Sequence, residues 1–211
     1  MAKNDEAYRK IVATPLELLG AGISGHVFAA DDHTVVKVAL KSNNTYVDNE
    51  RLRDHLIERR IYERLGKHKR ICELKYATDR GLVLERLKQC LRERLEDFQK
   101  HDTVPSHEEA VRWSIQAAQA SAYIHENGIL QSDMGCHNYL LDEDDNVKLC
   151  DFGGSSIDGS IPLCAPGAGF QRPMDDTDTF TVKDDLFALG STLYEIWTSK
   201  RPYQNDQNDS R

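Results

Sequence analysis

Three oxygen-bearing side chains in the second half of the chain have a spacing that could support chemistry. Asn138 lies five residues after Asp133, and Asp151 follows thirteen residues later. Carboxylate and amide oxygens bind Mg²⁺, and a carboxylate can also accept the proton of a hydroxyl group. Each residue alone reads as a turn residue, but the ordered set predicts phosphoryl transfer. Asp133 would accept the proton, and Asn138 and Asp151 would bind the metal.

A glycine-rich stretch near the N-terminus offers a partner function. Gly20, Gly22 and Gly25 precede Val27 in the pattern G-x-G-x-x-G-x-V. Glycines let the backbone approach phosphates closely, although glycine-rich hairpins are also common for purely structural reasons. A dinucleotide-binding loop would open a helix, whereas residues 27–30 continue as an apolar strand. This favours a loop that covers ATP.

One lysine lies inside an apolar strand. Lys37 has valines on both sides, so it either faces solvent on an edge strand or is buried and needs a partner. Glu58 shares a helix side with Ile61 and Leu65. Glu63 falls roughly 140° around the same helix. We therefore expect a Lys37–Glu58 pair that holds the lysine against the α- and β-phosphates of ATP.

The apolar pattern predicts a strand-rich part followed by a helix-rich part, which join near residues 85–87. The first part is expected to contain strands over residues 16–19, 27–30, 34–40 and 82–84 and one helix over 48–65. The second part is expected to contain helices over 87–100, 106–128 and 184–197, a hairpin over 139–150 and a long mobile loop over 154–180.

Two helix starts carry a capping box, in which a hydroxyl residue is followed three positions later by an acidic one. These pairs are Ser106 with Glu109 and Thr181 with Asp184. The helix that begins at Ser106 is expected to have one apolar face, formed by Val111, Ile115, Ala118 and Ala122.

The overall composition limits the class of partner and the compartment. The chain has 211 residues, a net charge of −8, and 39% hydrophobic residues, so nucleic acid and anionic membrane surfaces are not expected as partners. No apolar run reaches the roughly 18 residues that span a bilayer, and the charged N-terminus does not resemble a secretory signal. Five cysteines without metal or redox spacing favour a reducing, cytoplasmic environment.

Taken in order, these segments resemble the eukaryotic protein-kinase family from roughly Leu16 to Tyr203. The resemblance implies one domain over residues 1–211 with a two-lobed α+β fold. An antiparallel sheet plus one helix is expected over about 12–85, and a mainly helical lobe that lacks its last helices over about 88–203. A polar tail is expected over 204–211. Residues 153–158 and 185–191 look most like a divergent group of small fungal kinase-like proteins.

The resemblance also assigns roles by position. The residues that it implies for ATP binding are Gly20, Gly22, Gly25, Val27, Lys37, Glu58, Glu85 and Leu87, with the last two in the adenine hinge. The residues that it implies for catalysis are Asp133, Lys37, Asn138 and Asp151, of which Asn138 and Asp151 would bind Mg²⁺. Leu84 resembles the gatekeeper, and Asp185 resembles the buried aspartate that braces the catalytic loop.

The sequence departs from the family pattern at several positions. Ser132 replaces the arginine of His-Arg-Asp, so the usual receptor for an activation-loop phosphate is absent. Gly135 replaces a lysine that helps to neutralise the transferring phosphoryl group, which should slow the chemistry. The Ala-Pro-Glu motif has no clean match, because residues 165–167 lie too far from Asp185 and residues 172–174 lack the glutamate.

Three functions are compatible with these motifs. The first is a protein kinase that uses ATP and Mg²⁺ to phosphorylate Ser or Thr of a protein substrate. The second is a pseudokinase or binding module that keeps the fold, which the altered motifs favour. The third is a small-molecule phosphotransferase, against which the glycine loop and the segment 185–197 argue. The identity of the acceptor, the oligomeric state and the regulation cannot be read from the sequence.

Overall fold

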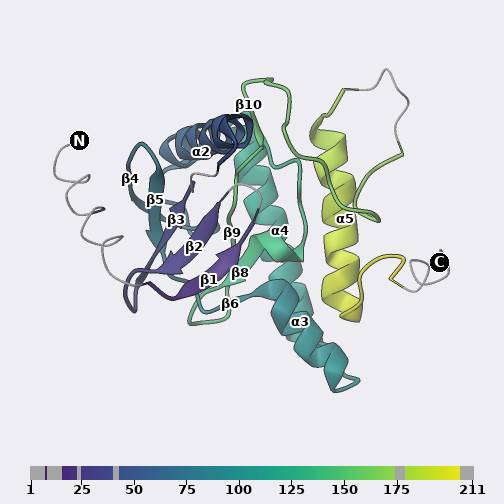
Figure 1. Ribbon diagram of the computed structural model, residues 1–211. Coiled ribbons are helices and arrows are strands. Elements are labelled where there is room, and N and C mark those ends of the chain that lie inside the picture. Colours follow the sequence, from purple (N-terminus) through teal and green to yellow (C-terminus); the bar gives the residue numbers. More distant parts are fainter. Residues whose placement is uncertain (1–7, 9–15, 23–24, 40–42, 174–178, 205–211) are drawn as a thin grey trace. The chain divides into compact units, whose positions relative to one another are not determined.

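Five antiparallel strands form the sheet of the N-terminal half, in the order β1-β2-β3-β5-β4 (Figure 1). The strands are β1 (Leu18–Ala21), β2 (His26–Ala29), β3 (Thr34–Val38), β4 (Leu74–Ala77) and β5 (Gly81–Glu85). Valines and leucines of β3 and β5 are buried, which makes these strands the centre of the sheet. The sequence pattern missed β4, a short strand that pairs with β5.

One long helix packs on this sheet. Helix α2 (Thr45–Leu65) begins at Asn44, whose side chain accepts hydrogen bonds from the backbone N–H groups of Tyr46 and Val47. The helix ends at Gly66, whose φ of 58° is a left-handed value that favours glycine. Its buried residues are His55, Glu58, Ile61, Tyr62 and Leu65.

The structure describes residue 8 and residues 16–22, 25–39, 43–173 and 179–204. The chain divides into two compact units, of which the first comprises residues 1–87 and 152–154 and the second comprises 88–151 and 155–211. The predicted polar tail lies almost entirely outside the described residues. No helix among the described residues is long and apolar enough to cross a membrane.

Helices dominate the second unit. The helices are α3 (Leu91–Lys100), α4 (His107–Glu126), the 3-10 helix η1 (Cys136–Asn138) and α5 (Val182–Thr198). The short strands are β6 (Gln89–Cys90), β7 (Ile129–Leu130), β8 (Tyr139–Leu141), β9 (Val147–Leu149) and β10 (Ser156–Ile157). Strands β8 and β9 form the predicted hairpin, and β10 lies within the segment that was expected to be a loop. The α+β class is confirmed, with an antiparallel sheet first and helices after it.

Both predicted capping boxes are present. The Ser106 hydroxyl accepts a hydrogen bond from the backbone N–H of Glu109 and opens α4, and Thr181 and Asp184 cap α5 in the same way. Helix α5 buries Asp185, Ala188 and Ile196 on one side. Its other side keeps large apolar side chains exposed, namely Leu186, Phe187, Tyr194 and Trp197.

The predicted apolar face of α4 is wrong. Ile115, Ala118 and Ala122 are exposed. The apolar residues of the buried face are Ala110, Trp113, Ala117, Ala120 and Ile124. The Trp113 indole N–H donates to the Asp145 carbonyl at 2.9 Å, which fixes this face against the β8–β9 hairpin. The buried face also includes Gln116. Its polar side chain interrupts the apolar pattern, so the sequence did not indicate this face.

Charge substitutions on neighbouring residues of α4 test this corrected face. Ala117→Lys should lower the free energy of unfolding by at least about 3 kcal/mol, because the ammonium group would be buried without a partner. Ala118→Lys should change it by less than about 0.5 kcal/mol, because the side chain would extend into solvent. Urea denaturation followed by circular dichroism measures both, and equal losses would contradict the corrected face.

Candidate functional site

The predicted ion pair lies inside the first unit. Lys37 is the fourth residue of β3 and lies opposite Val27 of β2, and its Nζ is 2.8 Å from Oε2 of Glu58 on α2. Both side chains are buried, whereas Glu63 is half exposed and pairs with Arg59 on the helix surface. The helix geometry therefore selects Glu58 over Glu63, as the sequence predicted.

Glu58 has a second contact within the same unit. Its Oε1 accepts a hydrogen bond from the backbone N–H of Phe152 at 3.3 Å. The Phe152 ring is fully buried and packs edge-on against Tyr62, with 5.1 Å between the ring centroids. The glutamate therefore connects the lysine to the backbone at Phe152, the residue that follows Asp151.

The glycine loop has one sterically required glycine among those described. A Cβ atom on Gly25 would lie 2.6 Å from the carbonyl oxygen of Val38, a backbone atom that cannot move aside cheaply. A Cβ atom on Gly20 would meet no protein atom within 4 Å, so the protein itself does not require glycine there. A close approach of phosphate would supply the missing reason. The tip of the loop, residues 23–24, lies outside the described residues.

The expected hinge residues end the first unit. Leu84 is buried in β5, and Glu85 is held by residue Glu73, because its Oε1 accepts the Glu73 backbone N–H at 2.8 Å. This contact occupies one oxygen of the Glu85 carboxylate. The roles of Glu85 and Leu87 in the adenine hinge stay a prediction.

A buried carboxylate organises the loop that contains Asp133 in the second unit. The two oxygens of Asp185 accept the backbone N–H groups of Gln131 at 2.8 Å and Ser132 at 2.9 Å. His125 of α4 adds a contact of 2.9 Å to the same carboxylate. Ser132 has a φ of 66°, a left-handed value that costs of order 1–3 kcal/mol in a residue other than glycine. These contacts hold the strained loop in place.

Asp133 and Asn138 are brought together by this loop. The Asn138 Nδ2 donates to the Asp133 backbone carbonyl at 2.8 Å, which leaves Oδ1 as the amide atom able to bind a cation. The Asp133 carboxylate is about one-third exposed, and its Oδ2 lies 3.0 Å from Nε2 of His137. Its other oxygen is therefore available to a hydroxyl group.

Gly135 and His137 depend on each other sterically. A Cβ atom on Gly135 would lie 2.7 Å from two atoms of the His137 ring, so the ring occupies the space that a side chain at residue 135 would need. The sequence pattern indicated the loss of the family lysine but gave no role to His137. The available signal was a titratable residue directly before Asn138 in the motif.

Asp151 is also oriented from the catalytic loop. The Gln131 Nε2 donates to the Asp151 backbone carbonyl at 2.7 Å, and Asp151 has a left-handed φ of 54°. Among the described residues, no three His, Cys, Asp or Glu side chains gather into a preformed metal site.

The class of protein follows from a match to a known family. A family model described as the protein kinase domain matches residues 13–211, and this chain belongs to the protein kinase family. The narrower resemblance to small fungal kinase-like proteins stays a prediction.

Several curated relatives match most of the chain. It is 28% identical over 205 residues to mitogen-activated protein kinase kinase kinase dlk-1 of Caenorhabditis elegans, a match that covers 90% of this chain and 20% of the relative. It is 26% identical over 204 residues to serine/threonine-protein kinase PLK4 of Xenopus tropicalis, a match that covers 90% of this chain and 21% of the relative. The chain therefore matches about a fifth of the length of these relatives.

Substitutions of the buried pair test its energetics. Glu58→Leu alone should lower the free energy of unfolding by about 3–5 kcal/mol, because the buried charge of Lys37 would lose its contact with the Glu58 carboxylate. The double variant Lys37→Met/Glu58→Leu should recover most of that loss, because two apolar side chains replace both charges. Urea denaturation measures both variants. A double variant no more stable than Glu58→Leu would show that Lys37 is not the source of the penalty.

Proposed function

We propose that this chain binds ATP with Mg²⁺ and transfers the γ-phosphoryl group to a serine or threonine hydroxyl of a protein. The observation that carries the proposal is the loop held by Asp185, which presents the Asp133 carboxylate and the Asn138 amide together. The Lys37–Glu58 pair and the open space at Gly20 support ATP as the donor.

Asp133 would act on the acceptor. Its oxygen accepts the proton as the hydroxyl oxygen forms a bond to the γ-phosphorus, and the bond from that phosphorus to the bridging β-oxygen breaks. The electron pair leaves with ADP. Lys37, held by Glu58, would anchor the α- and β-phosphates. The phosphoryl group passes directly from ATP to the hydroxyl oxygen, so no covalent intermediate with the protein is needed.

Asn138 and Asp151 would hold Mg²⁺. The metal, when bound, supplies neutralisation of phosphate charge. The Oδ1 of Asn138 is directed to that task because its Nδ2 is already used by the Asp133 carbonyl. The backbone of Asp151 is fixed by Gln131.

A nucleotide-binding protein without transfer activity is the second candidate. The contact of His137 with Oδ2 of Asp133 favours it, since a neighbouring donor competes for the carboxylate that must accept the proton. The absence of a lysine at Gly135 favours it as well.

ATP with Mg²⁺ should stabilise the chain against heat. At a nucleotide concentration one hundred times the dissociation constant, linkage gives roughly 2.7 kcal/mol. Differential scanning fluorimetry with ATP, Mg²⁺ and both together measures the effect. Absence of a shift with millimolar Mg²⁺-ATP, in a sample shown to be folded, would remove both candidates.

Two aspartate variants separate the two candidates. Asp151→Asn should weaken binding of Mg²⁺-ATP and abolish turnover, because a metal ligand loses its charge. Asp133→Asn should leave nucleotide binding intact and lower the transfer rate by roughly 10²–10⁴-fold, because only proton acceptance and acceptor positioning are lost. Radiolabelled phosphate transfer and fluorimetry measure the two properties.

Asp144→Asn is the matched control, since Asp144 is an exposed acid in the β8–β9 turn. It should match the wild type in both assays. A wild-type transfer rate in Asp133→Asn would contradict the role of Asp133, and wild-type binding without measurable transfer would select the nucleotide-binding candidate.

A further inference from the structure

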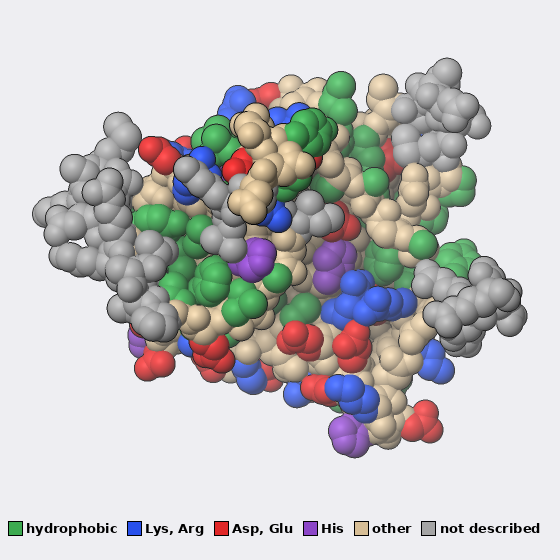
Figure 2. All heavy atoms as spheres, in the orientation of Figure 1, with side chains coloured by type: hydrophobic (Ala, Val, Ile, Leu, Met, Phe, Trp, Pro, Cys, Tyr) green, Lys and Arg blue, Asp and Glu red, His purple; other side chains and the backbone are tan. Residues whose placement is uncertain are grey.

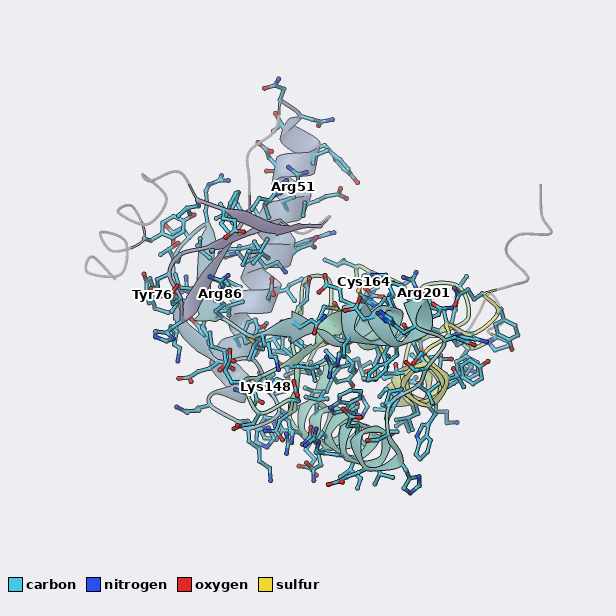
Figure 3. All side chains as sticks on the ribbon, turned by 90° about the horizontal axis from the view of Figure 1, so that it is seen from below. Arg51, Tyr76, Arg86, Lys148, Cys164 and Arg201 are labelled. Atoms are coloured by element: carbon cyan, nitrogen blue, oxygen red, sulfur yellow. The ribbon has the colours of Figure 1, made fainter. Side chains whose placement is uncertain are left out.

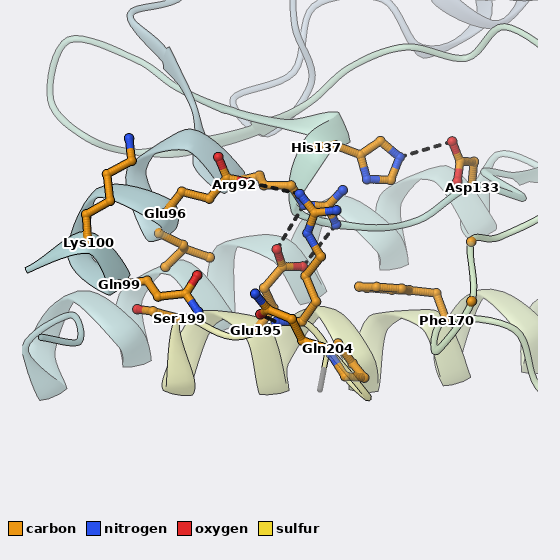
Figure 4. Close-up of a pocket in the computed structure, with 15 residues that line it drawn as sticks. Arg92, Glu96, Gln99, Lys100, Asp133, His137, Phe170, Glu195, Ser199 and Gln204 are labelled. Atoms are coloured by element: carbon orange, nitrogen blue, oxygen red, sulfur yellow. Dashed lines mark hydrogen bonds and ion pairs between the residues drawn. The ribbon is translucent and has the colours of Figure 1, made fainter. Parts of the chain in front are cut away.

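A cavity of about 640 Å³ lies beside Asp133, wholly within the second unit (Figure 4). Asp133 and His137 line it, together with residues of α3 and α5 and the loop that contains Phe170. Because Asp133 is the proposed proton acceptor, a protein segment that offers its hydroxyl group there would place neighbouring residues in this cavity. The inference below therefore rests on the proposed function.

A buried ion pair forms part of the cavity wall. The Arg92 guanidinium of α3 donates from Nε to Oε1 of Glu195 at 2.9 Å and from its terminal nitrogen to Oε2 at 3.0 Å (Figure 4). The Glu195 side chain is only 3% exposed, whereas that of Arg92 is 16% exposed. Burial lowers the pKa of Arg92, but the hydrogen bond and the charge of Glu195, with smaller contributions from neighbouring groups, together outweigh burial and raise the pKa above its usual value. Both oxygens of Glu195 are thus occupied.

Arg92 keeps donors for a ligand. A guanidinium has five N–H groups, and the bonds to Glu195 use two of them. The guanidinium also lies over the Phe170 ring, 5.7 Å from its centroid, which fixes its plane. Ser199 adds a hydroxyl group that lines the same cavity, is buried and has no hydrogen-bond partner among the described residues. The wall therefore offers polar groups that await a partner.

The other charges of the cavity do not provide a free carboxylate for a basic ligand. Glu96 pairs with Arg201 at 2.8 Å. Arg201, which is labelled in Figure 3, belongs to the segment that follows α5. Lys100 also lines the cavity and pairs with Asp97 at 3.0 Å. Of the described carboxylates in the wall, Asp133 alone lacks an arginine or lysine partner, and it is the proposed proton acceptor.

We infer that Arg92 is a specificity-determining residue, and that the cavity selects protein segments with acidic side chains near the acceptor hydroxyl and rejects basic ones. A carboxylate would accept hydrogen bonds from the guanidinium donors that Glu195 leaves unused. A lysine or arginine side chain would face a cation whose counterion is already engaged, and such a repulsive contact is an effective source of specificity.

Peptide binding tests this inference independently of catalysis. Two fluorescein-labelled peptides would be identical except that glutamates flank the central serine in one and lysines in the other. Fluorescence anisotropy with the full chain at about 0.15 M salt limits long-range electrostatics to within about 8 Å. We expect the glutamate peptide to bind at least about tenfold more tightly, against the net charge of −8 of the chain.

Variants of the Arg92–Glu195 pair test whether the preference for the glutamate peptide depends on Arg92. Arg92→Leu should reverse the preference, because it exposes the cavity to an unpaired Glu195 carboxylate. The double variant Arg92→Leu/Glu195→Leu should bind both peptides about equally, and its apolar replacements protect the fold if the single variant unfolds. The matched control is Arg94→Leu on the same helix, since Arg94 packs on Phe98 away from the cavity wall. This control should keep the wild-type ratio.

The outcomes are distinguishable from a failure of the proposed function. Equal binding, a lysine preference in the wild type, or no binding of either peptide at millimolar concentration would overturn the inference. A glutamate preference that persists in the double variant would overturn it as well. If the ratio of the two peptide affinities depends on Arg92 but no phosphate is transferred to serine, the inferred charge selection is supported and the proposed kinase activity is contradicted.

Discussion

The carboxylate of Asp185 is excluded from solvent and would be costly to bury without partners. Backbone N–H groups of Gln131 and Ser132 and the ring of His125 supply these partners. The loop therefore passes through a left-handed conformation at Ser132 that an isolated peptide would avoid. Asp133 directly follows this bend and lines the neighbouring cavity.

The first unit depends on a comparable buried charge. Lys37 and Glu58 neutralise each other between β3 and α2, and Glu58 also accepts the backbone N–H of Phe152. A buried ion pair adds little net stability, because desolvation offsets much of the attraction. The role of the pair is instead to fix the direction of the Lys37 side chain, which extends from β3 to Glu58 on α2. On the face drawn in Figure 2, acidic and basic side chains are otherwise interspersed, without one large patch of either sign.

The departures from the family pattern are connected in the structure. Gly135 removes a cationic side chain, and the space is taken by the His137 ring, which contacts Asp133. Gln131 replaces the family histidine and still reaches the Asp151 carbonyl. The loop therefore differs from the family pattern in charge at these positions. Under the proposed function, charge near the acceptor hydroxyl would be set by elements outside the motif, above all by the Arg92–Glu195 pair.

The sequence by itself determined the class of fold, both capping boxes, the β8–β9 hairpin and the Lys37–Glu58 pair, because these depend on spacing along one strand or helix. It assigned the wrong face of α4 to the core, since a buried Gln116 looks polar until the backbone of Val147 is seen to donate to it. Only the tertiary structure decided that His137 contacts Asp133 across Gly135 and that Arg92 meets Glu195. That last contact joins residues 103 positions apart, and no local pattern encodes which charges meet when two distant helices pack.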